Sequence, residues 1–277
     1  MFIYIDSAED LRYLNNELLS KKYVGIDTEF RRTQKDNMKL GLLQINDSEE
    51  IYLIDTVLIN EPKDNCSFLF SDSVIKILHS CKEDIEAVYS WAGRSMENIF
   101  DTQIADSFLN GEFSISYQGL VEKILGIKVD KGETRSNWLR RPLRDSQLNY
   151  AASDVEFLIE LFKDQSKALI EENKDAWMDQ EIKSLSSRIF NDSYDYQDNA
   201  SGLTKAEERI LLNKFNDIVI YLAEKNEINQ TFLFSKKNQK YFLRLAINVG
   251  LDNALLEITQ WRSDLFGEPL TKILKTI

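Results

Sequence analysis

Four acidic side chains and one tyrosine have the types and the spacing that could bind metal ions. The segment YVGIDTEF, residues 23–30, is an apolar run that contains Asp27 and Glu29. In an extended strand residues i and i+2 point to the same face, so these two carboxylates project together. Unpaired buried charge is expensive, so the pair must be solvated, paired or bound to a cation. The Asp-x-Glu spacing recurs from residues 47, 84, 154 and 179, and a solvated strand end is therefore the alternative.

Two further segments carry the other candidates. Asp84 lies in HSCKEDIEAV, residues 79–88, at the predicted start of a helix, where the helix dipole favours an acid without any ligand. The segment DSQLNYAASDVEFL, residues 145–158, places Tyr150 and Asp154 on one face of a predicted helix. Four carboxylates can converge only around positive charge, and two divalent cations about 3.5–4 Å apart supply it in phosphoryl-transfer sites. Oxygen ligands favour Mg²⁺ or Mn²⁺, and the tyrosine hydroxyl could position or deprotonate an attacking water.

Most other catalytic motifs are absent from the sequence. It contains no Gly-rich phosphate loop, no dinucleotide-binding glycine motif, no nucleophile elbow and no His-Glu-x-x-His zinc motif. The one histidine, His79, could be part of a triad, but the arrangement of serine and cysteine around it, Ser80 and Cys81, does not favour one. Cys66 and Cys81 are not spaced as CxxC, so we expect neither a disulfide framework nor a thiolate metal site, and a reducing cytoplasm is favoured.

Composition limits the remaining classes of protein. The 277 residues are 43% hydrophobic and 29% charged, which is ample for a packed core. No apolar run reaches the roughly 18 residues that a membrane span needs, and the N-terminus carries acids where a secretory signal is basic. The net charge of −12 argues mildly against nucleic acid, although two bound cations would offset the charge of four carboxylates.

Hydrophobic patterning predicts an α/β fold followed by a helical unit. Strands grouped early in the chain and then alternating with helices indicate a sheet flanked by helices. The polar stretch 191–202 has no periodicity and predicts a linker. We therefore expect domains at 1–190 and 203–277, the second entirely helical. Strands are predicted at 2–5, 23–28, 40–45, 51–54 and 74–80, and helices after Ser7, at 84–92, 102–109 and 117–125, and as one long helix from about 146 to beyond 169.

Three segments resemble the motifs of the DEDD 3′–5′ exonucleases, and the fit is closest to ribonuclease D. They are IDTEF, HSCKEDIEAV and DKGETRSNWLRRPLRDSQLNYAASDVEFL. The third is the most specific, because a lysine, a tryptophan seven residues later, RPL and then YAASD follow in order. The resemblance covers residues 1 to about 190. It implies a ribonuclease H-like mixed sheet flanked by helices and a two-metal hydrolysis that releases nucleotides from a 3′ end.

The resemblance also implies a role for each candidate residue. Asp27 would bridge both metals, and Asp84 would help to hold the second one. Glu29 and Asp154 would hold the metal that activates water. Tyr150 would orient the nucleophile, as in the branch of the family that uses a tyrosine four residues before the last acid.

The other branch of the family uses a histidine five residues before the last acid, where this chain has Asn149. His79 is therefore not the catalytic base by this analogy. A hydrogen-bonded position beside the site is favoured for His79 over contact with substrate.

A basic segment offers a path for a single strand. Residues 131–144 carry five basic side chains against Glu133, with Trp138 between them, and such a mixture suits phosphate contact and base stacking. A core position for Trp138 is the favoured alternative. A second basic stretch, 235–244, could guide RNA or be a solvated face. The residues predicted to bind substrate are Thr28, Phe30, His79, Lys131, Arg135, Arg140 and Arg141.

The C-terminal part resembles the helical HRDC module of ribonuclease D, most clearly in ITQWRSDLFGEPLTKIL, residues 258–274. The chain has room for about one module where bacterial ribonuclease D usually has two. The predicted function is a Mg²⁺- or Mn²⁺-dependent exoribonuclease, expected to be monomeric, that trims RNA with a single-stranded 3′ end, such as transfer-RNA precursors. The alternatives are a 3′–5′ exodeoxyribonuclease of repair or proofreading, acting on single-stranded DNA, and a catalytically silent nucleic-acid-binding protein.

Overall fold

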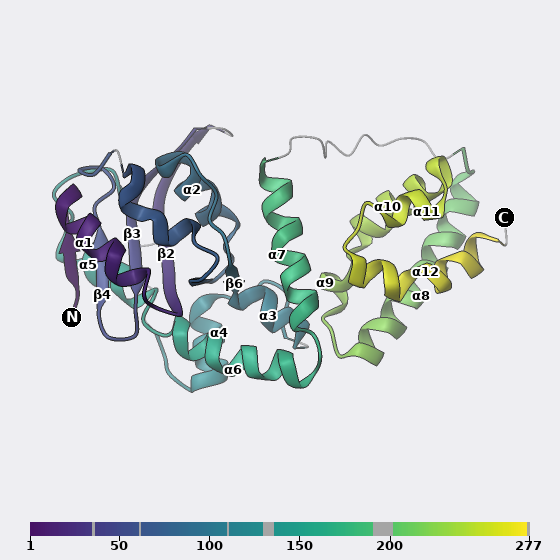
Figure 1. The fold of residues 1–277 in the computed structure, drawn as a ribbon. Coiled ribbons are helices and arrows are strands. Elements are labelled where there is room, and N and C mark those ends of the chain that lie inside the picture. The colour runs from purple at the N-terminus through teal and green to yellow at the C-terminus, as the bar shows by residue number, and fades with distance from the viewer. Residues whose placement is uncertain (35–36, 61, 110, 130–135, 191–201, 276–277) are drawn as a thin grey trace. The chain divides into compact units, whose positions relative to one another are not determined.

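The computed structural model describes residues 1–34, 37–60, 62–109, 111–129, 136–190 and 202–275 (Figure 1). The chain forms two compact units. Unit 1 consists of Met1–Ala105 and Ser114–Lys167, and unit 2 of Asp106–Phe113 and Ala168–Ile277. No described helix combines the length and the apolar composition that crossing a bilayer requires.

Unit 1 is built on a mixed six-stranded sheet with the order β1-β4-β3-β2-β5-β6. The pairs β2–β3 and β3–β4 are antiparallel, and β1–β4, β2–β5 and β5–β6 are parallel. The predicted mixed sheet with flanking helices is therefore confirmed. The strands are β1 Ile3–Ile5, β2 Tyr23–Gln34, β3 Asn37–Asn46, β4 Ile51–Ile54, β5 Ile75–Leu78 and β6 Ile99–Asp101.

Local sequence explains where the first helices begin and end. In α1 (Ala8–Leu18) the Ser7 side chain caps the first turn by accepting from the Asp10 amide, and Leu11, Leu14 and Leu18 form the buried stripe. α2 (Lys82–Ala92) ends at Gly93, whose φ of 71° is a left-handed conformation that favours glycine. The other elements before residue 172 are η1 Lys63–Phe70, α3 Thr102–Phe108, α4 Tyr117–Leu125, α5 Asp145–Ser153 and α6 Leu158–Glu171.

Strand β2 is longer than its sequence pattern predicts. The predicted strand ends at residue 28, whereas β2 continues to Gln34, which pairs with Asn37 of β3. Pairing with β5 stops at Gly25, so the later part of β2 is hydrogen-bonded only to β3. Asp27 and Glu29 therefore lie within a strand and not at its end, and the continuing hairpin with β3 is the physical reason.

The predicted long helix from about 146 to beyond 169 is wrong, because it is interrupted between α5 and α6. Four residues, 154–157, form a turn in which side chains replace the helical hydrogen-bond partners. The Asn46 amide donates to the carbonyls of Val155 and Glu156, each at 3.0 Å. The Tyr117 hydroxyl accepts from the Phe157 amide at 3.0 Å. Asp154 is consequently the C-terminal cap of α5 and not a mid-helix residue.

The described part of unit 2 contains helices and no strands, as the sequence predicts. Phe215, Phe234 and Phe266 pack edge to face in its core, with ring centroids 5.1–5.8 Å apart. The helices are α7 Asp175–Phe190, α8 Lys205–Asn226, α9 Gln230–Phe234, α10 Lys236–Val249, α11 Leu251–Leu255 and α12 Gln260–Leu274.

Helix α7 belongs to unit 2, although the sequence assigns it to the first domain. Trp177 on α7 stacks on Trp261 of α12 with ring centroids 5.2 Å apart. Glu181 on α7 forms an ion pair with Arg262. The predicted linker lies outside the described residues except for Gly202, and the domain limits at 190 and 203 stay a prediction.

Candidate active site

Three carboxylates meet where β2 has left β5 and α5 ends. One oxygen from each of Asp27, Glu29 and Asp154 lies within 4.8 Å of the other two. The three side chains are partly buried, and Asp154 Oδ1 has no hydrogen-bond partner among the described residues. An unpartnered, buried carboxylate oxygen in such a cluster fits a divalent cation with oxygen ligands. The structure thus brings together three of the four predicted metal ligands.

The fourth acid, Asp84, lies beside this triplet on the first turn of α2. Its side chain is 6% exposed, and Thr28 Oγ1 donates a hydrogen bond of 2.5 Å to its Oδ1. Since Thr28 stands between Asp27 and Glu29, β2 fixes the position of Asp84 directly. This arrangement is compatible with the predicted role of Asp84 at a second metal ion.

Asp101, at the end of β6, supports the same turn and was missed by sequence reasoning. Its carboxylate accepts hydrogen bonds from the amides of Ser80 and Cys81, at 3.1 and 2.7 Å, in the connection between β5 and α2. It also accepts from the amides of Gln103 and Ile104. An acid directly after an apolar run and before a predicted helix was the available signal for Asp101.

Burial raises the pKa of every carboxyl in the site, and neighbouring acids raise it further for Asp27, Glu29 and Asp84. Burial, followed by the charges of Asp84, Asp154 and Glu29, raises the pKa of Asp27 well above its ordinary range. Burial and the neighbouring acids raise the pKa of Glu29 to about 9. Burial raises the pKa of Asp84 to about 7 and that of Asp154 to about 6. Four carboxylates cannot all be ionised here without a compensating cation.

Tyr150 lies on α5, one turn before Asp154. Burial, then the charges of Asp154, Glu29 and Asp27 and its hydrogen bond with Asp154, raise the pKa of the Tyr150 hydroxyl. The phenol therefore stays protonated at neutral pH. Of the two roles considered for it, this state in the metal-free protein favours orienting a water over removing a proton. The Tyr150 ring lies 6.2 Å from the Trp138 ring.

Several predicted substrate-binding residues have contacts within the protein. The Thr28 hydroxyl is engaged by Asp84. His79 has both ring nitrogens engaged, Nδ1 with the Thr102 hydroxyl at 2.9 Å and Nε2 with the Ile115 carbonyl at 3.0 Å. These contacts favour the hydrogen-bonded role that the sequence suggests for His79. Phe30 is half-buried, and its contact with substrate stays a prediction.

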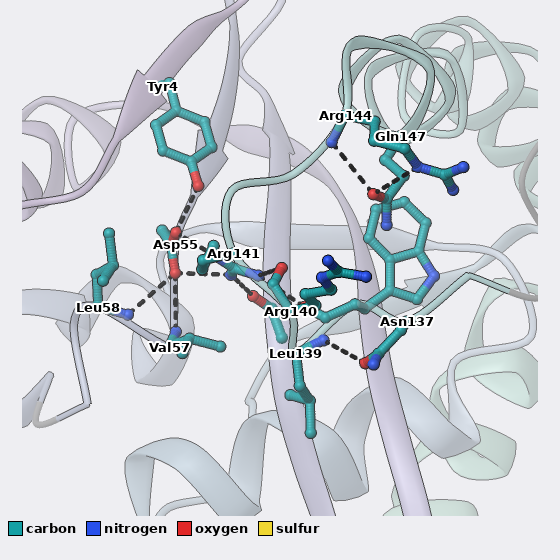
Figure 2. A network of polar contacts seen from close by, with 12 residues as sticks. Tyr4, Asp55, Val57, Leu58, Asn137, Leu139, Arg140, Arg141, Arg144 and Gln147 are labelled. Atoms are coloured by element: carbon teal, nitrogen blue, oxygen red, sulfur yellow. Dashed lines mark hydrogen bonds and ion pairs between the residues drawn. The ribbon is translucent and has the colours of Figure 1, made fainter.

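The basic segment has two kinds of arginine. Arg140 is exposed and stays a predicted substrate contact, whereas Lys131 and Arg135 lie outside the described residues. The guanidinium of Arg141 is turned inward onto Asp55, as Figure 2 shows. Its inward hydrogen bonds argue against the predicted phosphate contact. Trp138 is 3% exposed and belongs to the core, which is the alternative that the sequence favours.

The fold and the site define a class of protein. A family model described as a 3′–5′ exonuclease matches residues 2–170. The chain belongs to the 3′–5′ exonuclease family, and the resemblance of its three motifs is confirmed.

Ribonucleases D are among its relatives. Ribonuclease D of Shewanella sp. (strain ANA-3) is 36% identical over 181 residues, which are 65% of this chain and 47% of the relative. Ribonuclease D of Haemophilus influenzae is 40% identical over 149 residues, covering 54% of this chain and 37% of the relative. The chain thus spans about half the length, or less, of the curated relatives that it matches.

Solved structures share the fold. Escherichia coli RNase D, described as an exoribonuclease involved in structured RNA processing, has a TM-score of 0.64 at 23% identity, covering 100% of this chain and 75% of that one. Brucella melitensis NrnC with bound Mg²⁺ has a TM-score of 0.59 at 21% identity, covering 74% of this chain and 98% of that one. The match with RNase D supports the predicted exonuclease fold, and at these identities the two likenesses show the fold alone.

Proposed function

We propose that the chain is a metal-dependent exoribonuclease that removes nucleotides from RNA 3′ ends. The observation that carries this proposal is the cluster of Asp27, Glu29 and Asp154, with Tyr150 hydrogen-bonded beside it, in a chain of the 3′–5′ exonuclease family. The choice of RNA over DNA follows the ribonucleases D among its relatives.

Asp27, Glu29 and Asp154 would hold one divalent ion, and Asp27 with Asp84 would hold a second. Oxygen ligands suit Mg²⁺ or Mn²⁺, and the Mg²⁺ bound by NrnC supports the first of these. When bound, the ions would supply a reactive hydroxide and stabilise the charge that develops on the phosphate.

The protein's own groups would orient the reacting atoms. The protonated Tyr150 hydroxyl would hold the attacking water in line, since its hydrogen bond with Asp154 aims it into the carboxylate cluster. Thr28 would hold Asp84 in place through the hydrogen bond to its carboxylate. The exposed Arg140 would contact a backbone phosphate of the single strand.

The helical residues 203–277 are proposed to act as an HRDC-like module for structured RNA such as transfer-RNA precursors. Lys236, Lys237 and Lys240 lie on α10 and carry the charge that such a role needs. Arg244 on the same helix is less available, because it forms an ion pair with Glu208.

The test is a time course with 5′-labelled RNA and DNA of one sequence, each with a single-stranded 3′ tail, in Mg²⁺ or Mn²⁺. We expect a ladder that shortens from the RNA 3′ end and is abolished by EDTA and by Asp27→Asn. Mn²⁺ titration calorimetry on the same variant should show weakened binding with an unchanged circular dichroism spectrum. A ladder on DNA alone would indicate a deoxyribonuclease, and no ladder with no Mn²⁺ binding would indicate a silent domain.

A further inference from the structure

Arg141, the neighbour of the exposed Arg140, is partly buried and has a different environment. The Arg141 side chain is 16% exposed and its partner Asp55 is 0% exposed. Nε and Nη2 of Arg141 both donate to the Asp55 carboxylate. Tyr4 donates to the same carboxylate from β1, as Figure 2 shows. Bidentate pairing of this kind fixes the plane of the guanidinium.

The remaining donors of Arg141 reach three backbone carbonyls, one of which is the exposed Arg140 carbonyl, 3.1 Å from Nη1. Nη1 donates to the Trp138 carbonyl at 2.8 Å, and Nη2 donates to the Gly41 carbonyl at 2.6 Å. Asp55 is itself fixed by the amides of Val57 and Leu58, each at 3.0 Å. The fixed guanidinium thus holds the backbone carbonyls of Trp138 and Gly41 in place.

The first carbonyl belongs to the residue that supports Tyr150. Trp138 packs in a buried cluster with Leu42, Leu53 and Ala151, and Tyr150 packs against this cluster. The Trp138 and Tyr150 rings are 6.2 Å apart and inclined by 33°. A displaced Trp138 would therefore free the Tyr150 ring to move away from Asp154.

The second carbonyl lies opposite the metal-binding strand. In the β2–β3 ladder Glu29 pairs with Leu42 and Phe30 with Leu40, so Gly41 is a bulge residue without a partner on β2. A Cβ on Gly41 would lie 2.7 Å from the Trp138 carbonyl oxygen. The bulge therefore brings β3 against the segment that Arg141 holds.

We propose that Asp55 and Arg141 are positioning residues for Tyr150 and Glu29. Arg141 holds Trp138 behind the Tyr150 ring and holds the Gly41 bulge across the ladder from Glu29. The expected effect on kcat rests on the proposed function. The expected effect on the position of Trp138 does not. Both side chains are engaged within the protein, so their loss is expected to change the rate of the chemical step and not substrate affinity.

The test uses Arg141→Lys in the full chain. Lysine keeps a positive charge beside Asp55 but cannot donate to the carboxylate and to two carbonyls from a planar fork. We expect kcat on RNA to fall about 10- to 100-fold with KM unchanged, because a misplacement of about 1 Å has an effect of this size. Arg140→Ala, the exposed neighbour, is expected to raise KM instead.

A core truncation controls for stability. Leu18→Ala removes a fully buried side chain from α1, which makes no part of the proposed site. At a temperature where both variants are folded by circular dichroism, Leu18→Ala should keep the wild-type kcat. An equal fall of kcat in Leu18→Ala and Arg141→Lys overturns the inference. Tyr4→Phe, which keeps the Asp55–Arg141 pair, provides a milder second variant with a smaller fall of kcat in the same direction.

A readout without metal or activity separates this inference from the proposed function. The chain has four tryptophans, so metal-free protein labelled with 5-fluorotryptophan gives four ¹⁹F resonances, and Trp138→Phe assigns one of them. We expect Arg141→Lys to shift the Trp138 resonance and to leave the other three in place. An unmoved Trp138 resonance overturns the inference. If the wild type digests neither RNA nor DNA, the proposed function fails, and the ¹⁹F shift alone decides whether Arg141 positions Trp138.

Discussion

At the scale of single residues, the site is a set of like charges that the fold forces together. The carboxylates of Asp27, Glu29 and Asp154 lie within 4.8 Å of one another, and no described basic side chain is paired with them. The raised pKa values mean that the metal-free protein takes up protons when it folds. The clustered carboxylates suit a cation, and in its absence they lower the stability of the folded protein at neutral pH.

This arrangement predicts how stability depends on pH. Folding raises the pKa of Glu29 from 4.5 to about 9, so the folded state binds more protons than the unfolded state between these values. Stability that is present below about pH 4 is then lost as the pH rises towards 9. In EDTA we expect Tm, measured by thermal denaturation, to fall as the pH rises over this range. Glu29→Gln should flatten this dependence of Tm on pH. An unchanged slope in the variant contradicts the assignment, and Mn²⁺ should flatten the wild-type slope.

Tyr150 is predicted to act through its hydroxyl and not through its ring. Tyr150→Phe keeps the packing against Trp138 and removes the group hydrogen-bonded to Asp154. We expect kcat on RNA to fall about 100-fold, a typical size for a positioned proton donor or acceptor, while KM stays the same. Mn²⁺ affinity by calorimetry should be unchanged, because the carboxylates remain. A wild-type kcat in this variant would rule out the orienting role.

At the scale of elements, irregularities in secondary structure place the site. The turn between α5 and α6 leaves Asp154 at a helix end. The side chains of Asn46 and Tyr117 form hydrogen bonds with the backbone groups of this turn. The bulge at Gly41 adjusts the register next to Glu29. Each irregularity is compensated by hydrogen bonds from distant parts of the chain, which is why it persists.

The bulge predicts a large effect for a small substitution. In Gly41→Ala the new methyl group would lie 2.7 Å from a backbone oxygen and 3.1 Å from the Trp138 Cβ. Overpacking of this kind costs about 1–3 kcal/mol, measured by denaturant unfolding. Gly267→Ala on α12 is the matched control, since its nearest contact is an ordinary 3.6 Å and alanine favours a helix. Equal stability of the two variants would contradict the steric argument.

At the scale of the whole molecule, the chain has two cores with different composition. The core of unit 1 is a sheet covered by helices, and that of unit 2 is a set of packed aromatic rings. In unit 2 the Glu181 carboxylate of α7 accepts from the Trp261 indole at 3.0 Å and pairs with Arg262. Burial lowers the pKa of Arg262, so this charge depends on its partner.

Glu181 is therefore predicted to be essential for unit 2. Glu181→Gln leaves a buried guanidinium without its counter-ion, and breaking such a pair costs about 3–5 kcal/mol. Glu268→Gln, in an exposed pair with Lys272, should cost far less, because water screens an exposed ion pair. Chemical denaturation of both variants checks the difference. A similar small effect in both would show that α7 does not depend on this pair.

The amino-acid sequence by itself determined the chemistry and the class of fold. Apolar alternation is a local property, so β1, β3, β4, β5, the early helices and the helical C-terminal part were predictable near their observed limits. Strand β2 was predicted too short, and β6 was not predicted. The acids Asp27, Glu29, Asp84 and Asp154, with Tyr150, were recognisable because their motifs occur in order along the chain. Three of these acids, together with Tyr150, do converge in the structure.

Only the tertiary structure decided which polar residues serve the fold. Arg140 and Arg141 are adjacent and chemically identical, yet one is exposed and the other is held by Asp55, 86 positions away in the sequence. The interruption after α5 likewise depends on Asn46, 109 positions from Val155. Such contacts leave no local pattern, because they depend on which distant elements pack together, and packing is determined by the whole chain.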